Sequence, residues 1–259
     1  MTVKTLVKGL YVLEALASRS GPVGVAALAR ELGMPKSNVF RLLNALVAQR
    51  YVMKRSEDDQ YQITLKLWEL GTHVMSQVDL INAASSSLEE LASRSGETSQ
   101  LAMLDAYESV YVDKRDGRFP IRGFTKIGSR APAHCCATGK AELAFKAGDI
   151  VGSFEKRLKR YTSTTIVSPE QLTRELKKIR TQGFATNRGE WFEEVWGIAA
   201  PIRNGVGSVC GSVGIWGPKV RISKVVDRSV ENVTKAAAEI SAALGFRQAK
   251  LQPVRANRS

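Results

Sequence analysis

The sequence predicts a two-domain protein in which a mainly α-helical N-terminal domain is joined by a linker helix to an α+β domain. Three observations lead to this fold class. The chain has 259 residues, which exceeds the commonest size of a single domain. Its composition, 44% hydrophobic and 24% charged, is typical of globular proteins. Its hydrophobic pattern is helical over most of residues 1–48 and mixes helical and strand periods after residue 83.

Two helices are predicted in the first 35 residues. Leucines recur at three- and four-residue intervals across residues 6–16, which predicts an amphipathic helix that ends near residues 20–22. The stretch VAALARELG predicts a second, short helix with Gly33 at its C-terminal end. Pro35 follows at a turn, and we expect it at the first position of a third helix.

The third predicted helix has a polar front end and an apolar body. Its first turn carries Lys36, Ser37 and Asn38, and Arg41 follows on the same outward side. After it, the runs YVMKRS and YQIT on either side of the turn EDDQ predict a β-hairpin. Helix, helix, glycine-containing turn, helix and hairpin within residues 1–65 form the outline of a winged helix-turn-helix. A small helical packing module is the alternative interpretation.

A winged helix-turn-helix predicts contact with double-stranded DNA. Its second helix enters the major groove with its N-terminal residues at the base edges, so we predict operator contacts by Lys36, Ser37, Asn38 and Arg41. Lys54 and Arg55 lie in the hairpin, where we predict contacts with the phosphate backbone. The net charge of +13 fits an anionic partner but does not locate it, because residues 1–65 contribute only nine basic minus five acidic residues, or +4.

The chain changes character after residue 65. Residues 66–82 predict a linker helix, residues 83–246 mix helices and strands, and residues 247–259 form a basic tail. The stretch SPEQLTRELKKIRTQG predicts a helix capped by Ser168 and ended by Gly183. GIAAPIRNGVGSVCGSVGIWG predicts two strands joined by a turn, and a long amphipathic helix follows it to Gly245.

Composition argues against several classes of protein. No apolar run approaches the roughly 18 residues that a membrane helix needs, and Glu14 interrupts an N-terminal stretch that is amphipathic rather than a secretory signal. Three cysteines form no disulfide framework and fit a reducing cytoplasm, where we expect the protein to act. Two histidines and three cysteines without zinc-site spacing predict no metal site, and no cofactor is expected.

An enzyme is the alternative function, because His134, Cys135 and Cys136 are adjacent. A thiolate beside a histidine can act as a nucleophile, but adjacency in sequence is not the spatial pairing that catalysis requires, and no orienting acid can be identified. TGKA is similar to the end of a phosphate-binding loop, but Ala141 stands where that loop needs Ser or Thr. Salt-sensitive duplex binding would support a regulator, whereas turnover of a metabolite would support an enzyme.

In their order and spacing, these segments resemble the IclR-type family of bacterial transcription regulators over nearly the whole chain. The matching segments of the first domain are VKGLYVLEALA, VAALARELGMPKSNVFRLLNALVAQRYV and YQITLKLWELG. Those of the second are GETSQLAMLD, SVYVDK, ATGKAELAF, TRELKKIRTQGFAT, GIAAPI and ISAALG. The resemblance implies a winged helix-turn-helix and an effector-binding domain with a GAF-like fold.

The resemblance also implies a homodimer, often a dimer of dimers, on a pseudo-palindromic operator. Two winged helices related by a two-fold axis read half-sites about one helical turn apart. Candidate partner contacts are Leu6, Leu10, Leu13 and Trp68, which alternatively complete the core of the first domain. Whether the outcome is repression or activation depends on where the operator lies, which the sequence does not state.

A small organic acid is the effector that the resemblance implies, held by backbone N–H groups at the start of ATGKAELAF. The residues carried over are Ala137, Thr138, Asn187, Gly197, Gly214 and Trp216, with His134 just upstream as a further polar contact. Independently, the N–H groups and the dipole of a helix N-terminus favour a carboxylate.

The aromatic residues of this region indicate the size of the effector. Two of the carried-over positions are glycines, which remove side-chain volume, and Trp216 adds a flat wall to which Trp191, Phe192 or Trp196 could contribute. We therefore predict an aromatic or otherwise bulky carboxylate, or an amide-like relative, rather than glyoxylate or pyruvate. Alternatively, these aromatic residues belong to the core or to an interface.

Overall fold

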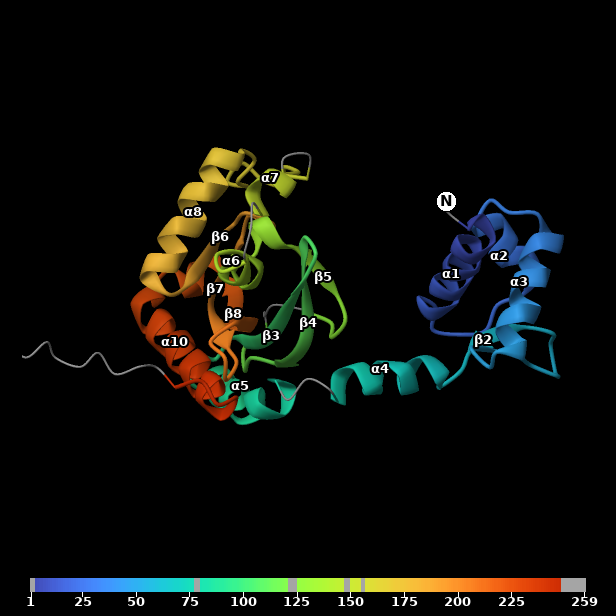
Figure 1. Cartoon of the computed structure of the whole chain (residues 1–259), viewed down its shortest axis with the longest axis horizontal. Coiled ribbons are helices and arrows are strands. Elements are labelled where there is room, and N and C mark those ends of the chain that lie inside the picture. The colour runs from blue at the N-terminus through green and yellow to red at the C-terminus, as the bar shows by residue number, and fades with distance from the viewer. Residues whose placement is uncertain (1–2, 77–79, 121–124, 147–149, 155–156, 248–259) are drawn as a thin grey trace, which may run out of the picture. The chain divides into compact units, whose positions relative to one another are not determined.

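The computed structural model describes residues 3–76, 80–120, 125–146, 150–154 and 157–247, which Figure 1 draws in colour. Contacts divide the chain into two units, residues 1–78 and 79–259. Residues 77–79 of the predicted linker helix and residues 248–259 of the predicted tail lie outside the described residues. The domain boundaries that we expect at residues 65, 82 and 246 stay a prediction.

The first unit contains three helices, a hairpin and a fourth helix (Figure 1). Their bounds are α1 Lys4–Ala17, α2 Val25–Glu31, α3 Lys36–Ala48, β1 Val52–Lys54, β2 Tyr61–Ile63 and α4 Lys66–Ser76. The two strands pair antiparallel, with Val52 opposite Ile63. This arrangement confirms the predicted winged helix-turn-helix.

The turn between α2 and α3 follows local rules. Gly33 has φ +60°, in the left-handed region that suits glycine, and it comes just after the last turn of α2 as predicted. Pro35 lies one residue before α3, with an extended ψ of 138°, and not at the first helical position that the sequence predicts. The prediction was wrong by one position because Pro35 supplies the carbonyl that accepts the first helical hydrogen bonds, from Asn38 and Val39.

Apolar side chains from all three helices and the hairpin form the core of the first unit. The most buried are Val12, Leu16, Leu28, Val39, Leu43, Val52 and Tyr61. Leu6 and Leu10, by contrast, are 62% and 48% exposed. The interpretation that they complete this core is therefore wrong for these two leucines, because they lie on a different face of α1 from the buried Val12 and Leu16.

The second unit is built on a six-stranded antiparallel sheet with the order β5-β4-β3-β8-β7-β6 (Figure 1). The strands are β3 Thr98–Asp105, β4 Glu108–Arg115, β5 Arg130–Pro132, β6 Ala185–Arg188, β7 Val195–Arg203 and β8 Val209–Pro218. The helices are α5 Leu80–Ser95, the 3-10 turn η1 Ala133–Cys135, α6 Ala137–Leu143, α7 Ile150–Phe154, α8 Pro169–Gln182, α9 Lys219–Ile222 and α10 Val226–Ala243.

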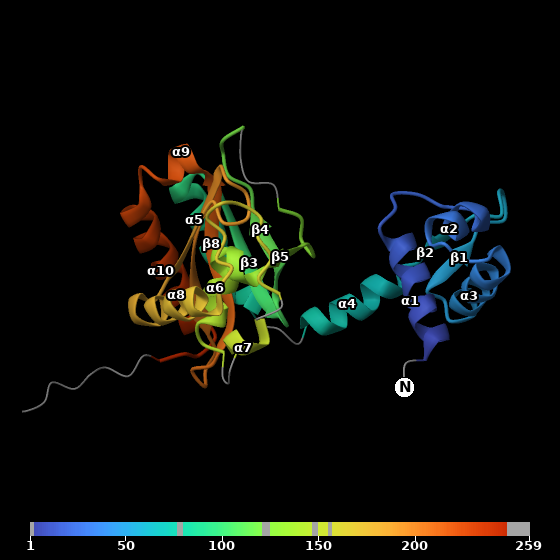
Figure 2. The same ribbon diagram turned by 90° about the horizontal axis from the view of Figure 1, so that it is seen from above.

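Helices cover both faces of this sheet. Helices α5 and α10 pack on each other and on the central strands, while α6 packs on β3, β7 and β8 with α8 beside it (Figures 1 and 2). Ala199 of β7 belongs to the core cluster formed with Ala141, Leu172 and Leu176 of α6 and α8. A sheet between helical layers is the predicted α+β, GAF-like architecture, and it is confirmed.

Two local predictions for this unit are also confirmed. The hydroxyl of Ser168 accepts a hydrogen bond of 3.2 Å from the Gln171 N–H, and Gly183 ends α8 with φ +82°. The hairpin between β7 and β8 turns at residues 204–208, where the Asn204 side chain accepts hydrogen bonds from the N–H groups of Val206 and Ser208. A side-chain oxygen that satisfies turn N–H groups is the usual reason for asparagine there.

We expect Leu43→Ala to destabilise the first unit by about 2–5 kcal/mol, because a fully buried leucine leaves a cavity when it is truncated. Urea denaturation followed by circular dichroism would measure the change. Asn44→Ala is the matched control, because Asn44 is exposed on the same helix. Equal destabilisation by the two substitutions would show that α3 does not pack as described.

Candidate functional site

The front end of α3 presents polar side chains on the side opposite its buried face. Lys36, Ser37 and Arg41 are exposed and Asn38 is half-buried, whereas Val39, Leu42 and Leu43 are buried. The structure thus brings the four predicted DNA contacts to the accessible side of one helix. The helix has no acidic residue in its first turn and no side-chain cap, because Pro35 has no polar side chain to offer. A phosphate would meet only favourable charge there.

Phe40 is a residue of this face that sequence reasoning missed. It lies between the predicted contacts Asn38 and Arg41 and is 46% exposed. An exposed apolar side chain beside polar ones is suited to the methyl group of thymine in the major groove. Its position off the apolar stripe of α3 is the sequence signal that could have identified it.

The predicted wing contacts, Lys54 and Arg55, are paired with acidic residues of their own hairpin. Lys54 Nζ lies 2.6 Å from Asp59, and this hydrogen bond is the main cause that raises the pKa of Lys54. Arg55 contacts Glu57 at 2.8 Å and Asp58 at 3.7 Å. Any phosphate must therefore compete with these carboxylates, although such exposed ion pairs are weak.

In the second unit, a cavity of about 260 Å³ opens beside the sheet. It is lined by Tyr111, Thr125, Lys126, Ser129, Arg130, Trp191, Phe192 and Trp216. Trp216 was a predicted effector contact, and Trp191 and Phe192 were predicted walls; the structure brings all three to this cavity. Trp196 does not line it, and its ring instead lies 5.4 Å from the Arg188 guanidinium.

Polar groups lie at the buried side of this cavity. Burial raises the pKa of the Tyr111 phenol, while its hydrogen bonds with Thr138 and Gln100 act in the opposite direction. Thr125 donates a 3.2 Å hydrogen bond to Gln100. The indole N–H of Trp216 is buried and has no hydrogen-bond partner among the described residues. A buried donor without a partner is costly.

The predicted contacts at the start of α6 lie behind the cavity rather than in its lining. Thr138 is 1% exposed and shares a 2.9 Å hydrogen bond with the Ser109 hydroxyl. Cys136 caps α6, because its sulfur accepts the Gly139 N–H at 3.4 Å. Ala137 is 6% exposed. Through Tyr111, however, Thr138 is linked to the cavity wall.

The remaining predicted effector contacts have partners of their own. Asn187 accepts the Glu190 N–H at 2.8 Å, and the His134 ring lies 3.2 Å from the Lys159 carbonyl. Asn187, Gly197 and Trp216 are neighbours in register across β6, β7 and β8. A Cβ at Gly197 would come within 3.7 Å of the Ala137 Cβ, so this row faces the start of α6.

Gly214 has a packing explanation. A Cβ there would lie 2.4 Å from the Ile198 carbonyl oxygen and 2.8 Å from the Ala199 Cβ, far inside contact distance. The space beside Gly214 is therefore occupied by β7 and is not ligand volume. This differs from the expectation that both glycines enlarge the pocket, because only the strand pairing reveals which atoms fill the position.

The His134, Cys135 and Cys136 cluster has no reactive thiolate. All three side chains are buried, and burial raises the pKa of both thiols and lowers that of His134. The imidazole is directed to a backbone carbonyl, and the Cys135 sulfur lies 3.4 Å from the Pro132 carbonyl oxygen. A buried neutral thiol is a poor nucleophile.

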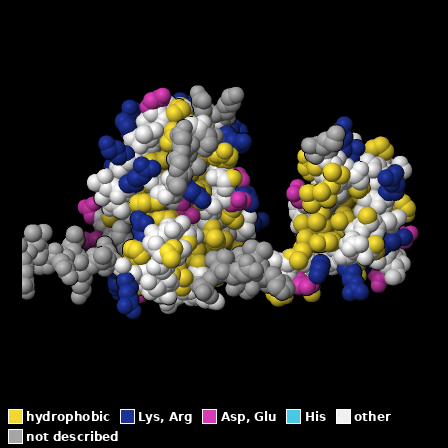
Figure 3. Space-filling model, in the orientation of Figure 1, with side chains coloured by type: hydrophobic (Ala, Val, Ile, Leu, Met, Phe, Trp, Pro, Cys, Tyr) yellow, Lys and Arg dark blue, Asp and Glu magenta, His cyan; other side chains and the backbone are white. Residues whose placement is uncertain are grey.

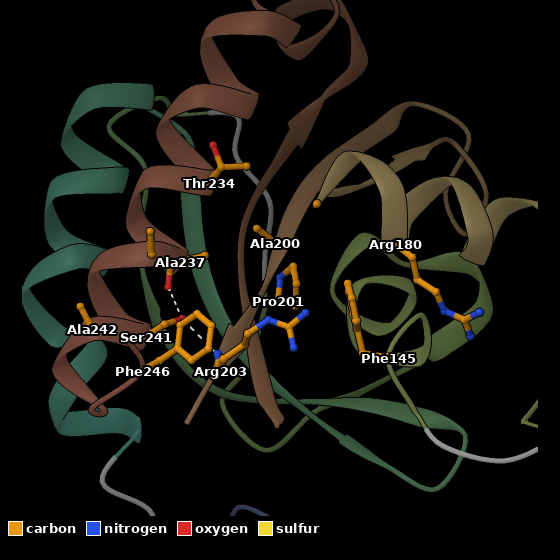
Figure 4. A pocket seen from close by; sticks show the side chains of 12 residues that line it. Phe145, Arg180, Ala200, Pro201, Arg203, Thr234, Ala237, Ser241, Ala242 and Phe246 are labelled. Atoms are coloured by element: carbon orange, nitrogen blue, oxygen red, sulfur yellow. Dashed lines mark hydrogen bonds between the residues drawn. The ribbon is translucent and has the colours of Figure 1, made fainter. Parts of the chain in front are cut away.

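A second cavity, of about 400 Å³, lies between α8, α10 and β7 (Figure 4). Although it is larger, none of the predicted site residues lines it. Arg203 lies 4.5 Å from the Phe145 ring and donates to the Gly207 carbonyl, and Arg180 donates to the Ala144 carbonyl. Both arginines thus satisfy backbone carbonyls. The carbonyl that Arg180 satisfies belongs to Ala144, the C-cap of α6, where the helix dipole disfavours an anion.

Within the described ranges, no helix is long and apolar enough to cross a membrane. The same residues contain no group of three or more His, Cys, Asp or Glu side chains that could hold a metal ion.

Comparison with known proteins gives matches over both units. The family model described as the IclR helix-turn-helix domain matches residues 5–56, and the model described as the bacterial transcriptional regulator IclR C-terminal domain matches residues 72–242. The regulator KdgR of Escherichia coli K12 is 33% identical over 248 residues, which cover 95% of this chain and 94% of KdgR. The repressor AllR of Salmonella typhi is 30% identical over 249 residues, which cover 94% of this chain and 91% of AllR.

Solved structures agree with these matches. The crystal structure of the Thermotoga maritima IclR protein has a TM-score of 0.76 at 29% identity, covering 95% of this chain and 100% of that one. The structure of an IclR homolog from Microbacterium hydrocarbonoxydans, complexed with 4-hydroxybenzoate, has a TM-score of 0.80 at 23% identity. The match covers 93% of this chain and 98% of that one. The second match is a likeness of fold.

We expect Gly214→Ala to destabilise the second unit, because the new methyl group would push β7 away from β8 at a backbone oxygen that cannot move freely. Thermal unfolding would measure the loss. Gly21→Ala is the control, since a Cβ at Gly21 meets nothing within 4 Å. An unchanged melting temperature with altered ligand binding would instead make Gly214 part of the ligand space.

Proposed function

The chain belongs to the IclR family of bacterial transcriptional regulators, and from that premise we propose that α3 contacts an operator while the cavity of about 260 Å³ binds the effector. The protein is a ligand-responsive, DNA-binding transcriptional regulator and not an enzyme, as its named relatives are regulators. We infer a cytoplasmic location from its DNA target.

The polar, exposed face of α3 over a buried apolar face is the observation that carries the DNA-binding proposal. Lys36 and Ser37 lie in the first turn, the part of a recognition helix that reaches the base edges. Arg41 follows about one turn later and can form the paired hydrogen bonds that guanine offers in the major groove. We assign Asn38 to the same surface and Phe40 to apolar contact with thymine.

We assign Lys54 and Arg55 to the phosphate backbone. Their ion pairs with Asp59, Glu57 and Asp58 hold the two cations on the hairpin in the free protein. A phosphate approaching the wing can replace these carboxylates as a partner. The nearby acids also weaken sequence-independent attraction, so the wing adds less to non-specific binding than two unpaired cations would.

We propose that the DNA-binding unit is a homodimer. Leu6, Leu10 and Tyr11 of α1 are 62%, 48% and 52% exposed, and Figure 3 shows hydrophobic side chains gathered over this helix. Trp68 of α4 is 69% exposed. Large apolar side chains grouped on one helix are typical of a protein interface, and a two-fold dimer presents two recognition helices to a pseudo-palindromic site.

We propose an aromatic carboxylate as the effector class. Trp191, Phe192, Trp216 and Tyr111 provide flat walls. Lys126 also lines the cavity, as does Arg130, which is paired with Asp105 and Glu108. The Trp216 N–H and the cluster of Tyr111, Gln100 and Thr125 supply polar groups within. A mostly aromatic pocket with few polar groups is the usual form of a small-molecule site. That a relative of this fold is complexed with 4-hydroxybenzoate supports the choice of class.

Arg41→Ala should weaken operator binding by about 1–3 kcal/mol, because it removes a base contact. The operator would be selected from a random duplex library, and affinity would be measured by fluorescence anisotropy at several salt concentrations. Arg94→Ala is the control, since it removes the same charge from an exposed position of α5 in the second unit. Unchanged affinity in the double variant Lys36→Ala and Arg41→Ala would overturn the assignment of the recognition helix.

Isothermal titration calorimetry should detect binding of 4-hydroxybenzoate or benzoate, and Trp216→Ala should abolish it by removing a cavity wall. Trp196→Ala is the control, because Trp196 does not line the cavity. Pyruvate and glyoxylate should bind weakly, as they leave most of the aromatic surface uncovered. Tight binding of the short acids only, unaffected by Trp216→Ala, would contradict the proposed effector class.

A further inference from the structure

Lys140 is a buried cation that neither the DNA-binding nor the effector proposal uses. It lies on α6, is 0% exposed, and its Nζ is 2.6 and 2.7 Å from the two carboxylate oxygens of Glu190. Glu175 of α8 lies farther away, at 3.5 Å. An ammonium removed from water needs such a partner, because an unpaired buried charge has lost its hydration without compensation.

Glu190 belongs to the short connection between β6 and β7, whose backbone is fixed on several sides. The hydroxyls of Thr162 and Thr164 donate to the Gly189 carbonyl at 2.7 and 2.9 Å. Thr165 donates to the Glu190 carbonyl at 2.6 Å, and Asn187 accepts the Glu190 N–H. These hydrogen bonds hold the backbone of Glu190 in one position, and from there its side chain reaches inward to Lys140.

The next two residues of this connection are walls of the proposed effector cavity. Trp191 and Phe192 line it, with their ring centroids 4.5 Å apart. Trp191 also packs on the buried cluster that contains Tyr111 and Cys136, the residue that caps α6. The ion pair therefore joins α6 to the segment that carries two aromatic walls, at the residue directly before them.

We propose that Lys140 and Glu190 are positioning residues for the effector cavity, which set where Trp191 and Phe192 lie without touching the ligand. Two short charge-assisted hydrogen bonds to a fully buried ammonium are strong, and they tie the Glu190 side chain to α6. The proposal rests on the proposed function only in naming the cavity as an effector site. The alternative is that the pair stabilises the domain without defining the wall.

The test measures the environment of Trp191 in the absence of any ligand. The chain has four tryptophans, so replacing Trp68, Trp196 and Trp216 with phenylalanine leaves Trp191 as the single reporter and retains an aromatic wall at position 216. In this full-length background, Glu190→Gln should shift the Trp191 emission to longer wavelength and increase acrylamide quenching. The reason is that the amide cannot hold the buried ammonium in the same geometry.

Glu142→Gln is the matched control. Glu142 lies on the same helix, is 5% exposed, and accepts hydrogen bonds from the Leu104 N–H and the Ser212 hydroxyl instead of contacting the connection. The Glu142→Gln substitution should lower the melting temperature but leave the Trp191 emission unchanged. Equal emission changes in Glu142→Gln and Glu190→Gln would overturn the proposal, because a general loosening of the domain would then explain both.

A second pair of variants addresses the case in which Glu190→Gln does not fold. Thr165→Val removes the hydroxyl that holds the Glu190 carbonyl and should shift Trp191 emission, whereas Thr165→Ser keeps this hydroxyl and should not. Unchanged Trp191 emission in Thr165→Val would overturn the proposal, whether or not Glu190→Gln folds.

Titration with 4-hydroxybenzoate separates the two proposals. With the native tryptophans, Glu190→Gln should weaken its binding about tenfold, the equivalent of about 1.4 kcal/mol. If the native protein does not bind this probe but the emission of Trp191 still shifts in Glu190→Gln, the effector class fails and the positioning role stands. If the native protein binds it and Glu190→Gln binds equally well with unchanged emission, the positioning role fails and the effector class stands.

Discussion

The close packing of α6 against the sheet is the constraint on which the second unit depends. A Cβ at Gly139 would lie 2.4 Å from the Ala133 Cα, so α6 can approach η1 only with glycine at that position. Lys140 of this helix is fully buried, and the start of the helix lies against Gly197 and Tyr111. One short helix thus determines which polar groups meet behind the cavity, and its buried cation then requires Glu190 as a partner.

In the proposed function, the two units recognise their targets by different physical means. In the first, charge and hydrogen-bonding groups stand on the outside of a helix, where they keep their hydration until DNA replaces it. In the second, flat aromatic surface is gathered around a few buried polar groups, so desolvation makes each polar contact selective. The buried Trp216 N–H belongs to this second type, because a ligand that leaves it without an acceptor gains less from binding.

The elements that the sequence predicted are those governed by local rules. The cap of α8 at Ser168, its end at Gly183 and the polar front of α3 all follow from residues within a few positions of one another. The predicted start of α3 at Pro35 is one residue too early, because local preference fixes a turn more firmly than the exact start of a helix. The aromatic residues were identified by type, but Trp196 was assigned with Trp191 and Phe192 although it lies elsewhere.

The sequence by itself determined the fold class and the family, and it predicted which helix contacts DNA and which types of residue form the ligand site. Only the tertiary structure decided which side chains meet: Trp216 with Trp191 and Tyr111 at one cavity, Lys140 with Glu190 across 50 positions, and the wing cations with the acids of their own turn. The physical reason is that periodicity specifies which face of an element is buried, but not which other face covers it. Which face covers another depends on the strand order, which pairs β3 with β8, and the strand order depends on packing over the whole unit.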